Sequence, residues 1–227
     1  MSYIIAVSSS KGGPGKTNTV ANLADYWALK GKSVFVLDSD PNKNLSKWYS
    51  KKAIDNAFEG VELQTIEDEE KIIDAAETAA REHDIVLIDV AGVRSRALLY
   101  AAGIADLVIV PAQPSEDDID EAINTIEAVK NAAKLARRSV KYRVLLSQTR
   151  KGTIVLEHAA RQFEEINKIQ IFRTTIGQRE AHKQARFYGT TVMRTEPNGP
   201  AAEDFKNLGK EVEKVLKTED KPQQEAA

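Results

Sequence analysis

The sequence predicts an α/β protein in which a mostly parallel, twisted sheet carries helices on both faces. Apolar runs of strand length alternate along the 227 residues with segments of helical periodicity. Several of these runs, such as residues 34–37, are apolar throughout, as expected of strands that are covered on both faces. A glycine-rich turn joins the first run to the first helix. We expect residues 1–217 to form one domain and residues 218–227 to be a polar, disordered tail.

The individual elements follow from the spacing of apolar residues. Val20, Leu23 and Trp27 recur at helical spacing, Gly31 suits the position after a helix end, and Ser115 is expected to cap a helix. The segment 49–66 is ambiguous and is interpreted as a helix followed by a short strand. The strands are expected at 3–7, 33–37, 61–66, 85–89, 106–111, 144–147 and 171–176. The other helices are expected at 16–30, 67–82, 98–104, 115–138, 154–167 and 201–217.

The turn at residues 8–17 has the composition of a phosphate-binding loop. It reads Ser8-Ser9-Ser10-Lys11-Gly12-Gly13-Pro14-Gly15-Lys16-Thr17 and lies between a strand and a helix. Glycines let backbone N–H groups surround an anion, and the helix N-terminus adds its positive dipole end. We expect Lys16 to pair with the β- and γ-phosphates and the Thr17 hydroxyl to ligate Mg²⁺. A glycine-rich turn with two solvated lysines is the weaker alternative, because the flanking strand and helix both fit the loop.

Acidic residues follow two other predicted strands. Asp38 and Asp40 end one of them, and Asp89 ends another, with Gly92 three residues later. The carboxyl ends of parallel strands are where α/β sheets place their chemistry. Capping and turn roles are the alternatives, but a phosphate loop needs a carboxylate partner at a strand end. We therefore expect Asp89 to hold Mg²⁺ and the Gly92 N–H to meet the γ-phosphate.

Composition excludes several classes of function. The formal net charge is −2, so a claim of nucleic-acid binding must depend on local clusters of bases. The chain has no cysteine, which removes disulfides, cysteine zinc sites and thiolate-held iron–sulfur clusters. No apolar run approaches the roughly 20 residues of a membrane span, and the first strand begins too early for a signal peptide. These observations favour a cytoplasmic location.

Basic residues gather in two places. Residues 130–143 hold six bases and no acid, although bases at a helix end also complement the helix dipole. A second basic stretch follows the last predicted strand. Either stretch could contact the phosphate backbone of DNA, and for the first a solvated helix end is an equal alternative. The candidate DNA-binding residues are Arg137, Arg138, Lys141, Arg143, Arg173, Arg179, Lys183 and Arg186.

The second lysine of the loop, Lys11, makes the motif resemble the deviant Walker A loop of the ParA/MinD superfamily. Asp38-Ser39-Asp40-Pro41 resembles the first switch element of that family, and the strand ending in Asp89 resembles its Walker B strand. The strongest likeness is to short ParA-type ATPases of plasmid partition without an N-terminal helix-turn-helix domain, because the loop begins so early. The likeness covers most of residues 3–195, and it implies a P-loop ATPase that uses ATP and Mg²⁺.

The resemblance also implies roles for particular residues. Two ATP-bound subunits would form a sandwich homodimer, in which Lys11 reaches the phosphates of the other subunit. Asp40 would position the attacking water, Asp38 would lie near the magnesium shell, and Thr149 and Arg150 would lie beside the base. The catalytic residues would be Lys11, Lys16 and Asp40. The nucleotide would be bound by Lys11, Gly12, Gly13, Gly15, Lys16, Thr17, Gly92, Thr149 and Arg150. The metal would be held by Thr17, Asp38 and Asp89.

The resemblance further implies partners. The dimer would bind non-specific DNA on the nucleoid, and a ParB-like centromere-binding adaptor would stimulate slow hydrolysis. The cargo stays open, because plasmid, chromosome, conjugation machinery or a protein assembly could each be moved by such an ATPase. A MinD-like membrane function is disfavoured, since the polar C-terminal segment cannot bury an apolar face. A reductase of this fold is disfavoured by the lack of cysteine.

Overall fold

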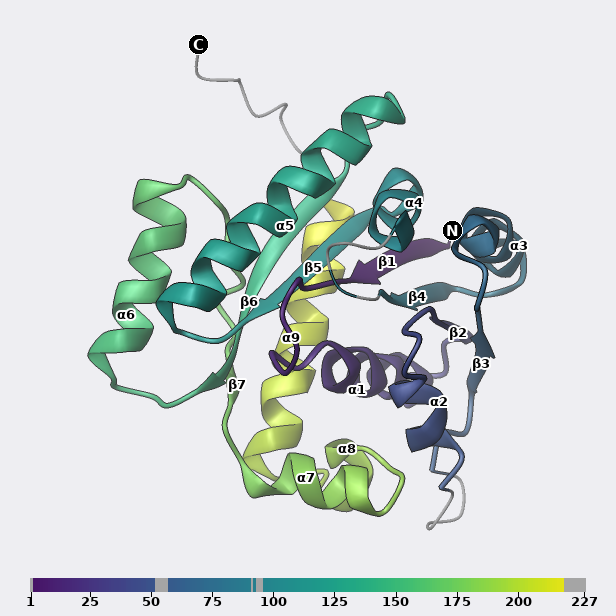
Figure 1. The fold of residues 1–227 in the computed structure, drawn as a ribbon. Coiled ribbons are helices and arrows are strands. Elements are labelled where there is room, and N and C mark those ends of the chain that lie inside the picture. Colours follow the sequence, from purple (N-terminus) through teal and green to yellow (C-terminus); the bar gives the residue numbers. More distant parts are fainter. Residues whose placement is uncertain (1, 52–56, 91, 93–95, 219–227) are drawn as a thin grey trace.

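The computed structural model describes residues 2–51, 57–90, 92 and 96–218 (Figure 1). Within this part of the chain, seven strands form one sheet in the order β3-β2-β4-β1-β5-β6-β7. Every pairing is parallel, which confirms the predicted fold class. The strands are β1 Tyr3–Val7, β2 Val34–Asp38, β3 Val61–Thr65, β4 Ile85–Asp89, β5 Leu107–Ala112, β6 Lys141–Thr149 and β7 Ile176–Gly177.

Helices cover both faces of the sheet, as parallel strands require (Figure 1). One apolar core joins the sheet to α1 Lys16–Ala28, α2 Asn44–Tyr49, α7 Glu180–Phe187, α8 Val192–Thr195 and α9 Pro200–Lys217. The other joins it to α3 Ile72–Glu82, α4 Arg96–Ile104, α5 Glu116–Leu135 and α6 Ile154–Arg161. A 3₁₀ turn at Glu69–Lys71 precedes α3, and a π-helical turn at Gln162–Ile166 follows α6. None of the helices in the described part of the chain combines the length and apolar character needed to cross a membrane.

The register of the central strands aligns three strand ends. Val7 at the end of β1 and Asp38 at the end of β2 both pair with Asp89 at the end of β4. The order also reverses at β1, since β2, β3 and β4 lie on one side of it and β5, β6 and β7 on the other. Ligands of open α/β sheets bind at such a switch point, outside the carboxyl ends of the strands.

The last strand is shorter than predicted. The sequence favours a strand at 171–176, but the structure holds only β7 and one isolated bridge between Val144 and Ile171. The N–H groups of Arg173 and Thr174 donate instead to the Glu211 carboxylate of α9, at 2.8 and 3.0 Å. A tertiary contact therefore replaces the expected sheet pairing.

Other element boundaries also differ from prediction. Helix α5 ends at Leu135 rather than at residue 138, because Arg137 adopts a left-handed conformation with φ 52°. Strand β6 begins at Lys141, three residues early, since its pairing with β5 starts there. The ambiguous helix of 49–60 lies earlier, as α2. Residues 52–56 of that segment, and residues 219–227 of the predicted tail, lie outside the described residues.

A buried ion pair ties the helix after the glycine-rich turn to the segment that follows α7. Asp25 of α1 is fully buried and accepts hydrogen bonds from the Thr191 hydroxyl and from Arg194 Nε, the latter at 2.7 Å. Asn22 Oδ1, one turn earlier on α1, accepts from the Val192 N–H at 3.2 Å. Desolvation raises the pKa of Asp25, and Arg194 and Thr191 oppose the rise. The charge of Asp25 is thus tolerable only with its cation in place.

We expect Arg194→Met to lower the free energy of unfolding by about 3–5 kcal/mol at pH 8, because it leaves a buried carboxylate without its cation. The loss should shrink at pH 5. Without Arg194 the pKa of Asp25 rises further, so Asp25 takes up a proton in the folded state as the pH falls. Urea denaturation at both pH values measures this, with Arg161→Met on the exposed face of α6 as control. Equal stability of the two variants would contradict the prediction.

Candidate functional site

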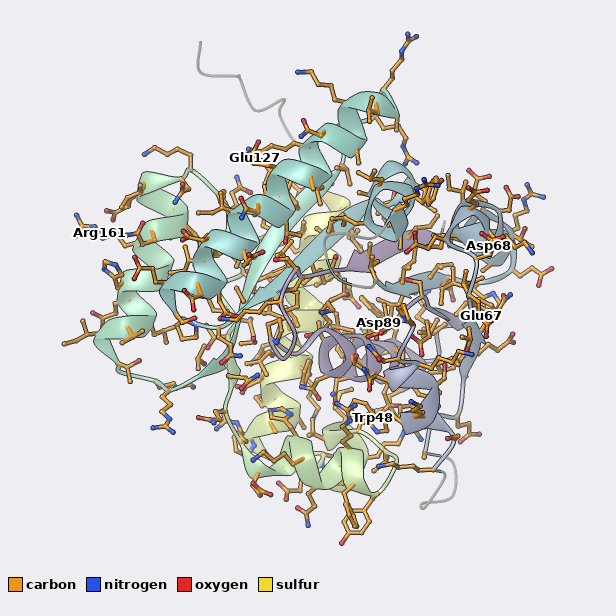
Figure 2. The ribbon with its side chains drawn as sticks, in the orientation of Figure 1. Trp48, Glu67, Asp68, Asp89, Glu127 and Arg161 are labelled. Atoms are coloured by element: carbon orange, nitrogen blue, oxygen red, sulfur yellow. The ribbon has the colours of Figure 1, made fainter. Side chains whose placement is uncertain are left out.

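A pocket of about 440 Å³ lies where the loops after β1, β2 and β4 meet. It brings together residues that the sequence analysis selected from three separate motifs. Figure 2 shows Asp89, which ends β4, near the centre of the molecule, whereas Glu127 and Arg161 lie at its periphery. The pocket is lined by Ser10, Lys11, Gly12, Gly13, Gly15, Lys16, Thr17, Asp40, Pro41, Asn42, Asn44, Gly92 and Arg186.

The loop after β1 has the conformation that an anion cradle needs. Gly13 and Gly15 have φ angles of 98° and 96°, which side chains with a Cβ rarely adopt, and Gly15 directly precedes α1. Lys16 Nζ lies inside the loop and donates to the carbonyls of Ser9 and Lys11, each at 3.2 Å. Desolvation lowers the pKa of Lys16, while Asp89 and Asp40 oppose that shift. The lysine is therefore a partly buried cation that an anionic ligand would stabilise.

Two residues at the end of β6 also hold this loop, and the sequence analysis missed both. The Ser147 hydroxyl donates to the carbonyl of Pro14 at 2.6 Å, and Gln148 Nε2 donates to the carbonyl of Gly13 at 2.5 Å. Gln148 has a positive φ of 52°. No local sequence signal reveals these contacts, because they join segments far apart in the chain.

Lys11 lies at the rim of the pocket and is paired within its own chain. Its Nζ is 2.8 Å from Asp118 Oδ2 and 3.8 Å from Asp117 Oδ2. The hydrogen bond to Asp118 raises the pKa of Lys11. Burial alone would raise the pKa of Asp118, but hydrogen bonds from Lys11, from the Ser115 hydroxyl and from the Gln113 N–H lower it overall. Ser115 is also the predicted N-cap of α5, which the structure confirms.

Asp89 is fully buried and unsatisfied. Neither of its carboxylate oxygens has a hydrogen-bond partner among the residues that the structure describes. Desolvation, followed by the nearby charge of Asp38, raises its pKa to about 7. The Thr17 hydroxyl and the Lys16 ammonium oppose the rise, although neither makes a hydrogen bond of ordinary geometry to the carboxylate. Such a group requires a proton or a cation.

Asp38 and Asp40 differ in their surroundings. Asp38 is buried, and its Oδ2 accepts from the N–H and hydroxyl of Ser46 at 2.9 and 2.7 Å. Asp40 lines the pocket, and its Oδ1 accepts from the N–H and Nδ2 of Asn42 at 2.8 and 3.1 Å. Asp38 thus fixes α2 through its hydrogen bonds with Ser46, whereas Asp40 lines the pocket and is held by its hydrogen bonds with Asn42.

Thr149 and Arg150 lie outside the residues that line the pocket. Thr149 is buried at the end of β6, where its hydroxyl donates to the carbonyl of Ile176 at 3.3 Å. Arg150 Nε donates to Gln178 Oε1 at 3.1 Å. These contacts place both residues between the ends of β6 and β7, so their role toward a base stays a prediction.

Two candidate DNA-binding residues, Lys141 and Arg138, donate hydrogen bonds to the carbonyl groups at helix ends. Lys141 Nζ donates to the carbonyls of Val215 and Leu216 at the end of α9, at 3.0 and 3.2 Å, and to that of Thr218. Arg138 donates to the last carbonyl of α4, Ile104, at 3.1 Å. These contacts satisfy carbonyls that a helix end leaves unpaired.

The other candidates divide into engaged and exposed side chains. Arg179 forms an ion pair with Asp204 of α9 at 2.9 Å, and Arg143 donates to the carbonyl of Tyr142 at 2.7 Å. Lys183 is exposed, and its Nζ lies 3.7 Å from Glu180 Oε2. Arg186 lines the pocket. The remaining two exposed arginines are Arg137 and Arg173.

We expect Asp89→Asn to stabilise the nucleotide-free protein in a pH-dependent way. A folded-state pKa of about 7 lies above the ordinary value of 3.8, so the folded state retains a proton that the unfolded state releases. The wild type therefore loses stability relative to the variant as the pH rises from 4 to 7, by roughly 4 kcal/mol in total. Denaturant titrations at pH 5 and 8 measure the free energy of unfolding of both proteins. If the variant were more stable than the wild type by the same amount at both pH values, the prediction would be wrong.

Comparisons with known proteins agree with the motifs. The family model described as VirC1 protein matches residues 1–216. Protein ParA of Rhizobium radiobacter is 25% identical over 202 residues, which cover 88% of this chain and 90% of that protein. The chromosome-partitioning ATPase Soj of Thermus thermophilus is 26% identical over 236 residues, covering 92% and 94%. The crystal structure of the cell division ATPase MinD of Pyrococcus furiosus superposes with a TM-score of 0.78, at 19% identity over 95% of this chain and 100% of that one. The chain belongs to the VirC1 protein family and, as the loop with its second lysine indicated, to the ParA/MinD superfamily.

Proposed function

We propose that this protein is an ATP-dependent, dimerising ATPase that segregates or positions DNA through a nucleotide-switched, non-specific DNA surface. The observation that carries the proposal is the pocket in which the loop of Lys11 and Lys16 meets Asp40 and Gly92. The names of its relatives, a chromosome-partitioning ATPase and a ParA protein, support the same interpretation. Hydrolysis is expected to be slow and to be stimulated by a ParB-like adaptor, and the protein is expected in the cytoplasm, on the nucleoid.

The residues of the pocket fit MgATP. The loop offers backbone N–H groups and the start of α1 to the phosphates, and Lys16 supplies a cation that donates to two backbone carbonyls of the loop. Thr17, which lines the pocket, and the buried, unsatisfied Asp89, which ends β4 and is not among the lining residues, are the groups that would hold Mg²⁺. A bound Mg²⁺ would neutralise charge on the phosphates during transfer.

We assign the catalytic carboxylate to Asp40. In hydrolysis a water oxygen attacks the γ-phosphorus, the bond from that phosphorus to the bridging oxygen breaks so that ADP leaves with that oxygen, and the proton that the water loses passes to the phosphate product or to solvent. The carboxylate of Asp40 lines the pocket and is held by Asn42, so it can orient this water. Asp38 would support the reaction indirectly, by fixing α2 through Ser46.

Dimerisation would require Lys11 to change partners. The Lys11 side chain is 40% exposed at the pocket rim, so it can swing toward a second subunit. Doing so breaks its hydrogen bond with Asp118, which keeps hydrogen bonds from Ser115 and Gln113. The phosphates of a partner subunit would have to compensate for that bond, which makes the dimer dependent on ATP.

We expect Lys11→Ala to bind nucleotide as the wild type does but to form no ATP-dependent dimer, because the cross-subunit cation is gone. Light scattering after size exclusion with ATP, ADP or no nucleotide measures the mass. Lys16→Ala is the comparison variant, and it should weaken nucleotide binding by about two orders of magnitude. An unimpaired ATP dimer of Lys11→Ala would refute the cross-subunit role.

The DNA surface would be provided by exposed arginines rather than by those that hold helix ends. Arg137, which follows α5, and Arg173, which precedes β7, are exposed, and no side-chain partner for either lies among the described residues. Lys141 and Arg179 are already engaged in contacts with α9. We therefore assign phosphate contacts first to Arg137 and Arg173.

Binding to non-specific duplex DNA tests the proposal directly. With ATP, but not with ADP or no nucleotide, we expect binding that weakens steeply between roughly 50 and 200 mM salt. Arg137→Ala and Arg173→Ala should each lower the slope of log affinity against log salt by about 0.9 for every phosphate that the arginine neutralises. Arg161→Ala is the matched control, because Arg161 is an exposed arginine at the end of α6 that is not among the candidate DNA-binding residues. If no nucleotide state binds DNA, the carrier function is wrong and positioning of a protein cargo becomes the better interpretation.

A further inference from the structure

Arg186 belongs to the nucleotide pocket, although the sequence analysis grouped it with the candidate DNA-binding residues. It lies near the end of α7, a helix that no nucleotide motif of the sequence includes. In the fold its side chain reaches the pocket formed by Lys16, Thr17 and Asp40. The position of α7 thus brings a third cation to a pocket that already holds Lys11 and Lys16.

The guanidinium of Arg186 packs against an aromatic ring. Its Cζ is 5.5 Å from the ring centroid of Trp48, on α2 and labelled in Figure 2. The ring itself is fixed, because Trp48 is 1% exposed and its Nε1 donates to the carbonyl of Thr190 at 3.0 Å. The main chain of Arg186 is held as well, since Lys51 Nζ donates to its carbonyl at 3.2 Å. Although Arg186 is exposed, these contacts hold its backbone and bring its guanidinium beside the fixed Trp48 ring.

This contact leaves the hydrogen-bonding edge of the guanidinium available. A cation–π contact uses none of the five N–H donors of a guanidinium. Among the residues that the structure describes, none accepts a hydrogen bond from these donors and no carboxylate lies within ion-pair distance. An oriented cation with unused donors at a pocket suited to phosphate is a site for a phosphate oxygen.

The side from which Arg186 enters indicates which phosphate it meets. Trp48 belongs to α2, and Asn42 and Asn44, at the start of that helix, line the pocket beside Asp40. Lys16 and Thr17 line the pocket from the start of α1. Arg186 therefore approaches from the side of Asp40, where the terminal phosphate of a triphosphate would lie.

We propose that Arg186 is a nucleotide-contacting residue that donates from the Trp48 ring to the terminal phosphate of a nucleoside triphosphate bound in the same subunit. The proposal rests on the proposed nucleotide function of the pocket. It makes α7 a part of the molecule that distinguishes ATP from ADP. Segment 190–195 keeps α7 in place, because Thr191 and Arg194 bond to the buried Asp25 of α1.

Titration calorimetry with a non-hydrolysable ATP analogue and with ADP, both with Mg²⁺, tests the proposal. Arg186→Ala should weaken binding of the triphosphate about 10- to 100-fold, the usual range for a hydrogen bond to a charged group. It should weaken binding of ADP less than about threefold. Arg186→Lys should restore little, because lysine lacks the planar fork that can pack on Trp48 and bond phosphate together. Arg161→Ala on α6, which removes the same side chain from an exposed ion pair, should bind both nucleotides as the wild type does.

Three outcomes would overturn the proposal. Arg186→Ala could bind the triphosphate as tightly as the wild type. It could lose both nucleotides equally together with a lowered melting temperature, which would indicate a structural role through Trp48. It could keep both nucleotides and lose only DNA binding, which would return Arg186 to the DNA surface. If the wild type and Arg161→Ala bind no nucleotide either, it is the proposed function that fails.

Discussion

Asp89 ends a fully buried strand, and the parallel register of β1, β2 and β4 decides what surrounds it. The register puts Asp38 opposite Asp89 and the glycine-rich loop beside it, so two buried carboxylates lie close to the partly buried Lys16. Without a ligand this arrangement is costly, since Asp89 has no hydrogen-bond partner in the described part of the chain. A metal ion with a polyphosphate relieves the cost for both the acid and the lysine. Ligand affinity and the cost of burying Asp89 are therefore two aspects of one feature.

Local sequence patterns predicted the fold class, and they singled out residues of three motifs that line one pocket in the structure. A phosphate loop depends on glycines and lysines at neighbouring positions, and the acids at two strand ends follow from the buried strands before them. The parallel sheet then brings such strand ends together without further information. Lys16, Asp40 and Gly92 accordingly meet in one pocket.

Contacts between distant segments could not be predicted in the same way. Ser147 and Gln148 hold the loop, Glu211 shortens the last strand and Lys141 closes the end of α9, and none of these pairings leaves a local pattern. Basic residues were the hardest to interpret, because one residue type serves helix ends, ion pairs, phosphates and DNA. The burial of each basic residue and its partners distinguish these uses, and both become known only from the fold.

The bonds of Lys141 have a practical consequence for attaching reporters. Lys141 begins β6, so it lies at the amino ends of the strands, whereas the pocket lies at their carboxyl ends. By donating to the carbonyls of Val215, Leu216 and Thr218, it fixes the point at which the chain leaves α9. A fluorescent protein fused directly after Thr218 would therefore start at the end of the sheet opposite the pocket. Such a fusion should leave both the pocket and the face around Lys11 unobstructed, so it is suited to imaging in cells.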